Sequence, residues 1–107
     1  MVIRNVAGHA QFPDTRMGKV SLAAGQHLYA GMNCFLPGQE HKAHVHSDQD
    51  KLYYVLEGSG EAQVGEELTR VSAGDLILAT AGVLHGLRNT GAGPLSVLVV
   101  FSPPPQR

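Results

Sequence analysis

The chain contains a single cysteine, Cys34, among its 107 residues. One cysteine excludes a disulfide within the chain, which fits a reducing compartment. Long hydrophobic runs are also absent, since no segment approaches the roughly 18–20 continuous apolar residues that a membrane-spanning helix requires. The first residues lack the basic, apolar and small-residue regions of a secretory signal. The sequence therefore predicts a cytoplasmic protein that is not integral to a membrane.

Charge is scarce and balanced. Charged residues make up 16% of the chain and hydrophobic residues 43%, a ratio that excludes a disordered chain and leaves enough apolar material for a core. Eight Lys and Arg residues oppose nine Asp and Glu residues, which gives a formal net charge of −1. Such a balance provides no excess of positive charge to attract nucleic acid or an anionic membrane, so neither is expected as a partner. The length predicts one domain over residues 1–107.

Glycine and proline divide the sequence into short apolar runs. The thirteen glycines and six prolines fall between runs of about five to ten residues, a rhythm typical of an all-β domain. No stretch has the sustained apolar spacing of a helix. Strands are expected at residues 20–23, 27–36, 52–57, 61–64, 68–71, 76–79, 84–89 and 95–101. This pattern predicts a barrel or sandwich, followed by a proline-rich tail at residues 102–107.

Histidine is abundant, with six in the chain. Three of them cluster as His41, His44 and His46. In a strand, residues two apart point to the same side, so His44 and His46 would converge on one point as a chelating pair. Such a pair arises easily, and on its own it favours two solvated side chains. His9 and His27 lie apart from this group and are expected to be ordinary strand or surface residues.

Two spaced blocks of residues surround these histidines. The first, residues 38–58, has its fixed positions at Gly38, His44, His46, Lys51 and Gly58. The second, residues 74–89, has its fixed positions at Gly74, Gly82, His85 and Asn89. Their spacing resembles the two motifs of the cupin superfamily, of the small single-domain type. The resemblance covers about half of the chain directly.

This resemblance implies an all-β fold, a single antiparallel β-barrel of jelly-roll type. It also implies that His44, His46 and His85 are the imidazole ligands of a divalent transition metal inside the barrel. Three imidazoles can hold Fe, Mn, Ni, Cu or Zn, with geometry and availability deciding which. Small cupins usually pair through an outer sheet. The strands at 52–57 and 95–101 are apolar on both faces, so a homodimer is expected.

Two positions depart from the motifs. Thr80 stands where the second motif has proline, although Ala81 and Gly82 still supply a chain reversal. Lys51 stands where the first motif has its glutamate ligand. Some cupin branches, such as thiol and diketone-cleaving dioxygenases, hold metal without that carboxylate. Its loss raises the net charge of a divalent site from about +1 to about +2, which favours an anionic or enolate substrate.

Three interpretations of Lys51 are open. It clamps a substrate carboxylate beside the metal, it pairs with Asp48 or Asp50 at the rim, or it marks a barrel that has lost its metal. An inward Lys51 would also turn Tyr53 inward, because strand residues alternate. Tyr53 would then be either a hydrogen-bond donor to substrate or a packed aromatic ring.

Three further residues are candidates for the missing ligand. Gln39 and His41 lie on the expected loop before the histidine pair, and histidines on loops are usually solvated. Asp50 is adjacent to the glutamate position, but it reaches the site only with a bulge or a register shift. Cys34 is expected to be a small buried hydrophobic residue rather than a reactive thiol.

The sequence thus predicts a small metal-binding cupin that acts on an anionic or oxygen-rich small molecule. The chemistry expected is dioxygenation or Lewis-acid isomerase or lyase catalysis, with Lys51 and Tyr53 as candidate catalytic residues. The alternative is a non-catalytic barrel that binds a small molecule or sugar, metal-free because Lys51 replaces the glutamate. A purely structural, metal-free barrel is a third hypothesis. No Ser-His-Asp order and no glycine-rich phosphate loop occurs, which excludes triad hydrolases and nucleotide-binding loops.

Overall fold

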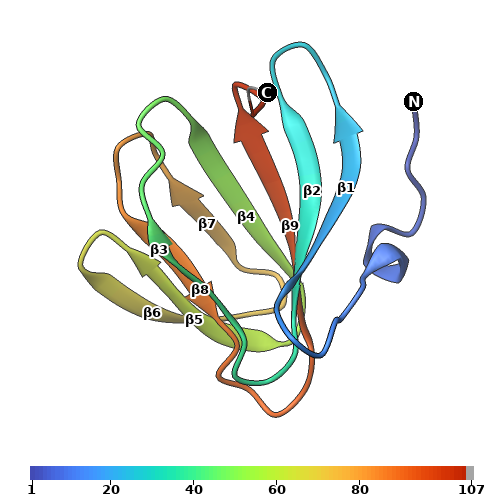
Figure 1. The fold of residues 1–107 in the computed structure, drawn as a ribbon, viewed down its shortest axis with the longest axis vertical. Coiled ribbons are helices and arrows are strands. Elements are labelled where there is room, and N and C mark those ends of the chain that lie inside the picture. The colour runs from blue at the N-terminus through green and yellow to red at the C-terminus, as the bar shows by residue number, and fades with distance from the viewer. Residues whose placement is uncertain (106–107) are drawn as a thin grey trace.

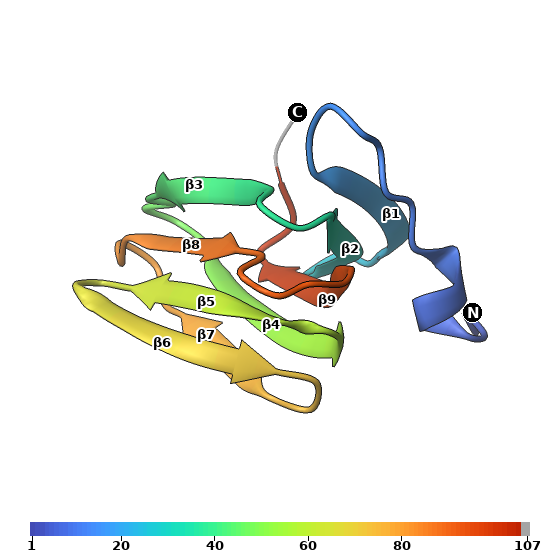
Figure 2. The same cartoon turned by 90° about the horizontal axis from the view of Figure 1, so that it is seen from below.

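The computed structural model describes residues 1–105. It consists of two antiparallel sheets that lie face to face (Figures 1 and 2). The strand order of the larger sheet is β1 (Gly18–Ala24), β2 (Tyr29–Phe35), β9 (Leu95–Ser102), β4 (Asp50–Glu57) and β7 (Leu76–Ala79). That of the smaller sheet is β3 (Glu40–His44), β8 (His85–Arg88), β5 (Ser59–Val64) and β6 (Glu67–Ser72). The all-β prediction is confirmed.

One short 3-10 helix, η1 (Val6–His9), precedes the strands. The sequence patterns showed no sign of this single turn. Within residues 1–105, no helix has the length and apolar character needed to cross a bilayer. The last two residues of the expected proline-rich tail lie outside the described residues, and Ser102, its expected first residue, still belongs to β9.

The eight strands expected from the sequence are all present, with ends that move by one or two residues. β3 was missed, because all residues of Glu40–His44 except Ala43 are charged or polar and lack the alternation of a half-buried strand. It is an edge strand that pairs only with β8. Within residues 1–105, no ladder joins the two sheets, so the pairing is that of a two-sheet sandwich and closure into a barrel stays unconfirmed.

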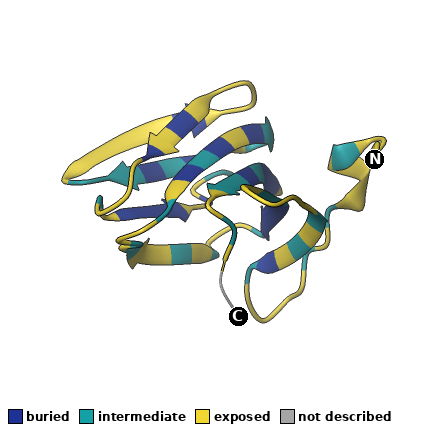
Figure 3. Cartoon of the chain, turned by 90° about the horizontal axis from the view of Figure 1, so that it is seen from above, coloured by how far each residue is buried: buried dark blue, intermediate teal, exposed yellow. Residues whose placement is uncertain are grey.

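Strand β4 shows how the sequence separates the interior from the surface. Lys51, Tyr53 and Val55 are buried, whereas Tyr54 between them is exposed. This is the period of two that a strand imposes on its side chains, and it confirms that Lys51 and Tyr53 share the inner face. The edge strand β7 shows the same alternation, whereas β2 has five buried residues in succession, and Figure 3 maps this burial along the chain.

The space between the sheets has two distinct ends. The register of the larger sheet aligns Phe35 with Leu95 at one end and Lys51 with Phe101 at the other. An apolar core fills the first end and the middle, and its members are Phe35, Tyr53, Val55, Ala62, Val71, Ile77, Leu87, Leu95, Val97 and Val99. Burial of these side chains supplies the main driving force for folding. The second end holds the polar residues described next.

Candidate metal centre

Three histidines from two distant parts of the chain meet at the polar end of the interior. His44 closes β3 and lies directly opposite His85, which opens β8. Their ring centroids are 4.4 Å apart, and the ring of His46 lies 4.7 Å from that of His44. One nitrogen of each ring lies within 4.8 Å of the corresponding nitrogens of the other two. The structure therefore brings together the three histidines that the sequence singled out.

His46 reaches this cluster in a different way from that expected. β3 ends at His44, so His46 lies in the loop that follows and not on the strand. The argument from strand alternation was therefore wrong for His46, although its ring arrives at the same place. Its backbone is tied to the turn between β7 and β8, because the Gly82 amide donates to the His46 carbonyl at 2.9 Å. Gly82 has a φ of 84°, a conformation that glycine adopts without strain.

A second glycine lets the two histidine-bearing strands approach. A side chain on Gly86 would lie 2.8 Å from the backbone nitrogen of Ala43, closer than side-chain carbons normally come. The ladder between β3 and β8 is irregular from His41 to His44, so the β3 backbone bulges over this glycine. The absence of a side chain at Gly86 thus allows the pairing that sets His44 against His85.

Hydrogen bonds determine which ring nitrogen of His44 and His85 is free to bind a metal. The Nδ1–H of His44 donates to the Lys42 carbonyl at 2.8 Å, and that of His85 donates to the Val83 carbonyl at 2.9 Å. Their Nε2 atoms are buried and have no hydrogen-bond partner. A buried polar atom without a partner costs free energy, and a proton held on Nδ1 by a carbonyl is the usual arrangement of a metal-binding imidazole. The donor set therefore fits a divalent transition ion.

The surroundings of His85 and His46 favour the neutral imidazole, which is the form that binds metals. Burial lowers the pKa of His85 and of His46, and the neighbouring His44 lowers both further. For His85, the hydrogen bond to Val83 opposes this effect in part. Both imidazoles are consequently neutral at pH 7 and carry a free lone pair.

His41 lies beside this cluster and outside the group of three. It is on β3 and not on a loop, so the expectation of a loop residue was wrong. Its ring centroid is 4.3 Å from that of His44, and its buried Nδ1 has no partner. Burial, followed by the charge of Lys51, lowers the pKa of His41 to about 3. His9 and His27 are exposed and lie outside the cluster, as expected.

Lys51 points into the interior, with only 2% of its surface exposed. Its Nζ lies 5.0 Å from the centre of the Tyr53 ring and 4.7 Å from that of Phe101. Burial, with a smaller contribution from the positive charge of Lys19, lowers the pKa of Lys51 to about 8. An ammonium over aromatic faces is partly compensated by the ring quadrupoles.

The structure does not support an ion pair of Lys51 at the rim. Asp50 faces away from the interior, and its carboxylate accepts a hydrogen bond from the Ala81 amide at 2.9 Å. Asp48 is exposed. Asp50 therefore stabilises the turn after β7 and does not replace the missing glutamate.

Tyr53 connects the core to the histidines. Its ring belongs to the apolar core, and its centroid lies 6.3 Å from that of His85. The hydroxyl is buried without a partner, and burial raises the pKa of Tyr53 well above its ordinary value. The hydroxyl is thus a proton-bearing donor with no acceptor among residues 1–105.

Asn89, the last residue of the second motif, has a structural role. Its side-chain amide donates to the carbonyls of Phe35 and Gly93 at 2.9 Å each, and its oxygen accepts from the Gly91 amide. It thereby closes the loop between β8 and β9. The motif residues consequently divide into those that form the cluster and those that hold the backbone around it.

Sequence reasoning missed two residues near Lys51. Phe101 packs against Lys51, while Lys19 lines the same cavity of about 120 Å³. Alternation along β9 would have placed Phe101 on the same face as Val97 and Val99. In the ladder, Phe101 lies opposite Lys51. No local pattern singles out Lys19, since its strand reaches the cavity only through the tertiary fold. Cys34 is fully buried and burial raises its pKa, in agreement with an inert thiol.

Comparison with known proteins decides the family. The sequence pattern of the cupin domain matches residues 31–101, which is more than half of the chain. The chain belongs to the cupin family. The resemblance inferred from the two motifs is therefore confirmed.

Solved cupin structures agree with this fold. The crystal structure of TT1209 from Thermus thermophilus has a TM-score of 0.93 with 37% identity, over 98% of this chain and 100% of that one. An RmlC-like cupin from Desulfovibrio desulfuricans has a TM-score of 0.86 with 26% identity, over 98% and 99% of the two chains.

Curated relatives resemble only part of this cupin. The oxalate-binding protein of Thermotoga maritima is 31% identical over 65 residues, which are 61% of this chain and 54% of the relative. The chain spans about half the length of the curated relatives it matches. Their activities therefore enter only as proposals.

Proposed function

We propose that this cupin binds a divalent transition metal through His44, His46 and His85 and acts on a small anionic or oxygen-rich molecule between its sheets. The observation that carries the proposal is the pair of buried, unpartnered Nε2 atoms of His44 and His85. Each opposing Nδ1 is already committed to a backbone carbonyl. Two lone pairs that face one point without a donor from the protein are stabilised by a cation.

The missing carboxylate defines the class of substrate. A divalent ion supplies Lewis acidity, and a redox-active one also supplies electrons to dioxygen, which covers isomerase, lyase and dioxygenase chemistry. With neutral imidazoles alone the site keeps its full positive charge, and Lys51 adds a further cation nearby. Both features favour an anion, and the name of the oxalate-binding relative supports a small carboxylate.

Lys51 and Tyr53 are the residues that we assign to the substrate. The Lys51 ammonium neutralises negative charge on the bound molecule, because it is buried and has two aromatic rings as its neighbours. The Tyr53 hydroxyl donates a hydrogen bond to a substrate oxygen, since it carries its proton and has no partner in the protein. Donors that are already in place when charge develops are the most effective form of electrostatic stabilisation.

The metal content of the purified protein tests this proposal. Protein prepared without chelator is expected to contain about one divalent ion per chain by elemental analysis. His44→Ala and His85→Ala variants are expected to lose most of it, whereas His27→Ala, at an exposed histidine outside the cluster, retains it. Equal metal content in all four proteins would refute the assigned ligands.

Oxygen consumption and product analysis over a set of small acids, diketones and thiols then identify the reaction. A dioxygenase consumes oxygen with one of these compounds, whereas an isomerase or lyase converts its substrate without oxygen. In either case, Lys51→Met is expected to lower turnover more than it lowers metal content. Loss of metal from Lys51→Met to the same degree as from His85→Ala would assign Lys51 to the metal site itself.

A binding protein without catalysis is the second candidate. Lys51 in place of the glutamate favours it, because a buried cation suits the capture of an anion without any reaction. Metal-loaded protein that binds carboxylates but converts none of the compounds above would support this alternative. A melting temperature that chelator leaves unchanged, without binding of any ligand, would support a purely structural fold.

A homodimer is part of the same proposal. The outer face of the larger sheet carries exposed apolar side chains, with Leu76 opposite Tyr54 and Leu78 opposite Leu52. A second copy of the chain would cover this face. Sedimentation equilibrium is expected to give a dimer for the wild type and a monomer for Leu78→Glu. A monomeric wild type at micromolar concentration would contradict the homodimer.

The single cysteine still predicts a cytoplasmic location.

A further inference from the structure

We infer that the cavity between Lys19 and Lys51 is an anion-binding subsite for a small carboxylate that works without a metal. The inference deepens the proposed function, on which it rests for the identity of the substrate. The cavity has a volume of about 120 Å³ and lies between the sheets, next to the histidine cluster. Lys51 lines it from β4, and Lys19 lines it from the edge strand β1.

The two lysines face this cavity without an acidic partner. No aspartate or glutamate is among the residues that line it. Lys51 is almost fully buried, and the charged group that lowers its pKa, after burial, is the like-charged Lys19. A buried ammonium is costly unless an anion accompanies it, and two ammonium groups around one cavity repel each other. An anion between them would relieve both effects at once.

The rest of the lining suits a small carboxylate. Asn33, buried on β2 opposite Lys19, contributes an amide group to the wall. His41 also lines the cavity, and the remaining wall is formed by apolar and aromatic groups, among them Val99 and Phe101. A volume of about 120 Å³ corresponds to about four water molecules at ~30 Å³ each, which is the size of a carboxylate with two or three carbons.

An open depression at the surface adjoins this cavity. It has a volume of about 470 Å³ and shares Lys19 and His41 with the cavity. Arg16 and Glu40 also line it. Lys19 therefore stands where the surface depression meets the interior, in the position to draw an anion inwards.

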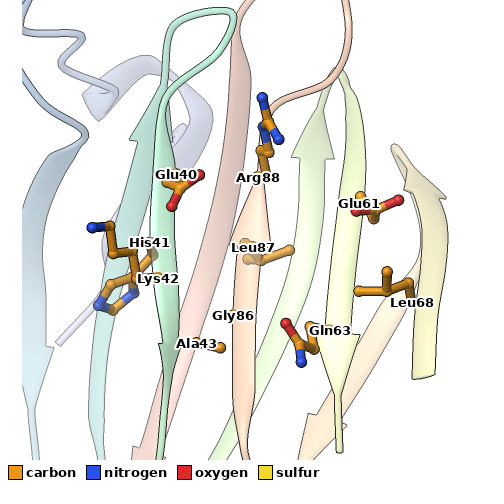
Figure 4. Close-up of a pocket in the computed structure, with 10 residues that line it drawn as sticks. All are labelled: Glu40, His41, Lys42, Ala43, Glu61, Gln63, Leu68, Gly86, Leu87 and Arg88. Atoms are coloured by element: carbon orange, nitrogen blue, oxygen red, sulfur yellow. The ribbon is translucent and has the colours of Figure 1, made fainter. Parts of the chain in front are cut away.

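A second depression on the smaller sheet provides a contrast. It spans β3, β8, β5 and β6 (Figure 4) and has a volume of about 260 Å³. Its charged side chains are Glu40 and Glu61 against Lys42 and Arg88, so positive and negative charges balance. The cavity at Lys51 has positive charge alone, and it is the one suited to an anion.

The subsite also adjoins the proposed metal centre. The Phe101 ring lies against Lys51 and is 6.4 Å from the His46 ring, while the Tyr53 ring lies 5.0 Å from Lys51 Nζ and 6.3 Å from the His85 ring. Each of these two rings thus lies close to the ammonium and to one histidine of the cluster. A dicarboxylate would place one end between the lysines and the other toward the histidines, which makes Lys19 and Lys51 selective for ligands with two anionic ends.

Calorimetric titration of metal-free protein tests the inference. Oxalate, malonate and acetate are titrated at low ionic strength into protein treated with chelator and freed of it, with uncharged oxamide as the control ligand. Malonate and oxalate are expected to bind, and oxamide is not. Lys51→Met is expected to weaken binding roughly tenfold or more, and Lys19→Met by several fold, because each removes a charged contact. Arg70→Gln, which removes one exposed positive charge on β6, is the matched control and should leave the affinity unchanged.

The outcomes separate this inference from the proposed function. Metal-free wild type that binds none of the three carboxylates, oxamide that binds as well as oxalate, or equal losses in Lys19→Met and Arg70→Gln would each overturn the subsite. If wild type then still retains metal through His44 and His85, the proposed function stands. If the purified wild type contains no metal but its metal-free form binds the carboxylates, the subsite stands and the proposed metal site is refuted. Lys19 is exposed, so its variant keeps the test valid even if Lys51→Met fails to fold.

Discussion

The two ends of the space between the sheets are built on opposite principles. At one end, Phe35, Val55 and Leu95 are completely buried and apolar. At the other, the imidazoles of His44 and His85 have buried nitrogen atoms without partners. An apolar end of this kind gains free energy when it is buried, whereas each unpartnered polar atom costs about 1–3 kcal/mol. The apolar end stabilises the fold. The histidine end holds unpartnered groups that can bind a ligand, and these groups lower the stability of the fold.

This contrast explains why Lys51 is tolerated. A lysine on the inner face of a central strand would normally destabilise a sandwich of this size. The apolar end and middle of the interior supply the stability that the polar end gives up. The following changes test whether the apolar end alone stabilises the fold and the histidine end alone binds ligands. They are given in order of decreasing effect on stability.

The largest effect is expected at the apolar end. Phe35→Ala should lower the free energy of unfolding by roughly 3–5 kcal/mol, because it leaves a cavity in a core without solvent access. Urea denaturation measures this change. Leu68→Ala, at an exposed position on β6 and away from the proposed dimer face, serves as the control and should change stability by no more than about 0.5 kcal/mol. Similar losses for both variants would mean that the interior is not the main source of stability.

The histidine end should become stabilising only when a cation is present. A metal ion at a free concentration 100 times its dissociation constant should stabilise the protein by about 2.7 kcal/mol. Thermal unfolding with Zn²⁺ or Mn²⁺, and again with excess chelator, measures the difference. His85→Ala is expected to show no metal-dependent shift. A shift of the same size in that variant would place the bound ion elsewhere on the protein.

Lys51 should make stability depend on pH. Its pKa falls from 10.5 to about 8 on folding, so the unfolded chain binds more protons between these values and stability rises with pH from about 8 to 10.5. Below pH 8 the buried Lys51 side chain keeps its positive charge in the folded protein, which lowers the free energy of unfolding. In metal-free protein at pH 7, Lys51→Met is therefore expected to gain about 1–3 kcal/mol and to lose the rise at high pH. Denaturation at pH 7 and pH 10 measures both effects, and a variant less stable than wild type at pH 7 would contradict them.

The smallest effect on stability is expected at Tyr53. Tyr53→Phe removes a buried hydroxyl that has no partner, so stability should change by no more than about 1 kcal/mol and in the direction of a gain. Ligand binding should weaken in the same variant. Comparison of its urea midpoint with its carboxylate affinity separates the two roles. A clear loss of stability without any loss of affinity would make Tyr53 a packing residue only.

Local pattern predicted much of the fold and of the candidate site. Strand alternation placed Lys51 and Tyr53 on the same face, because side chains on a strand alternate whatever the rest of the protein does. Motif spacing singled out His44, His46 and His85. β3 escaped detection because its polar residues carry no apolar period, and its strand character comes from pairing with β8. The same lack of a local signal hid the place of His41.

The amino-acid sequence by itself determined that the chain is all-β, where most strands lie, and which histidines and which lysine deserve attention. These properties follow from short-range periodicity and residue spacing. Only the tertiary structure decided that His46 approaches from a loop, that Asp50 turns away to the Ala81 amide, and that Lys19 shares a cavity with Lys51. Such relations join residues on strands that are far apart in the chain, so they depend on how the sheets pack and not on any local pattern.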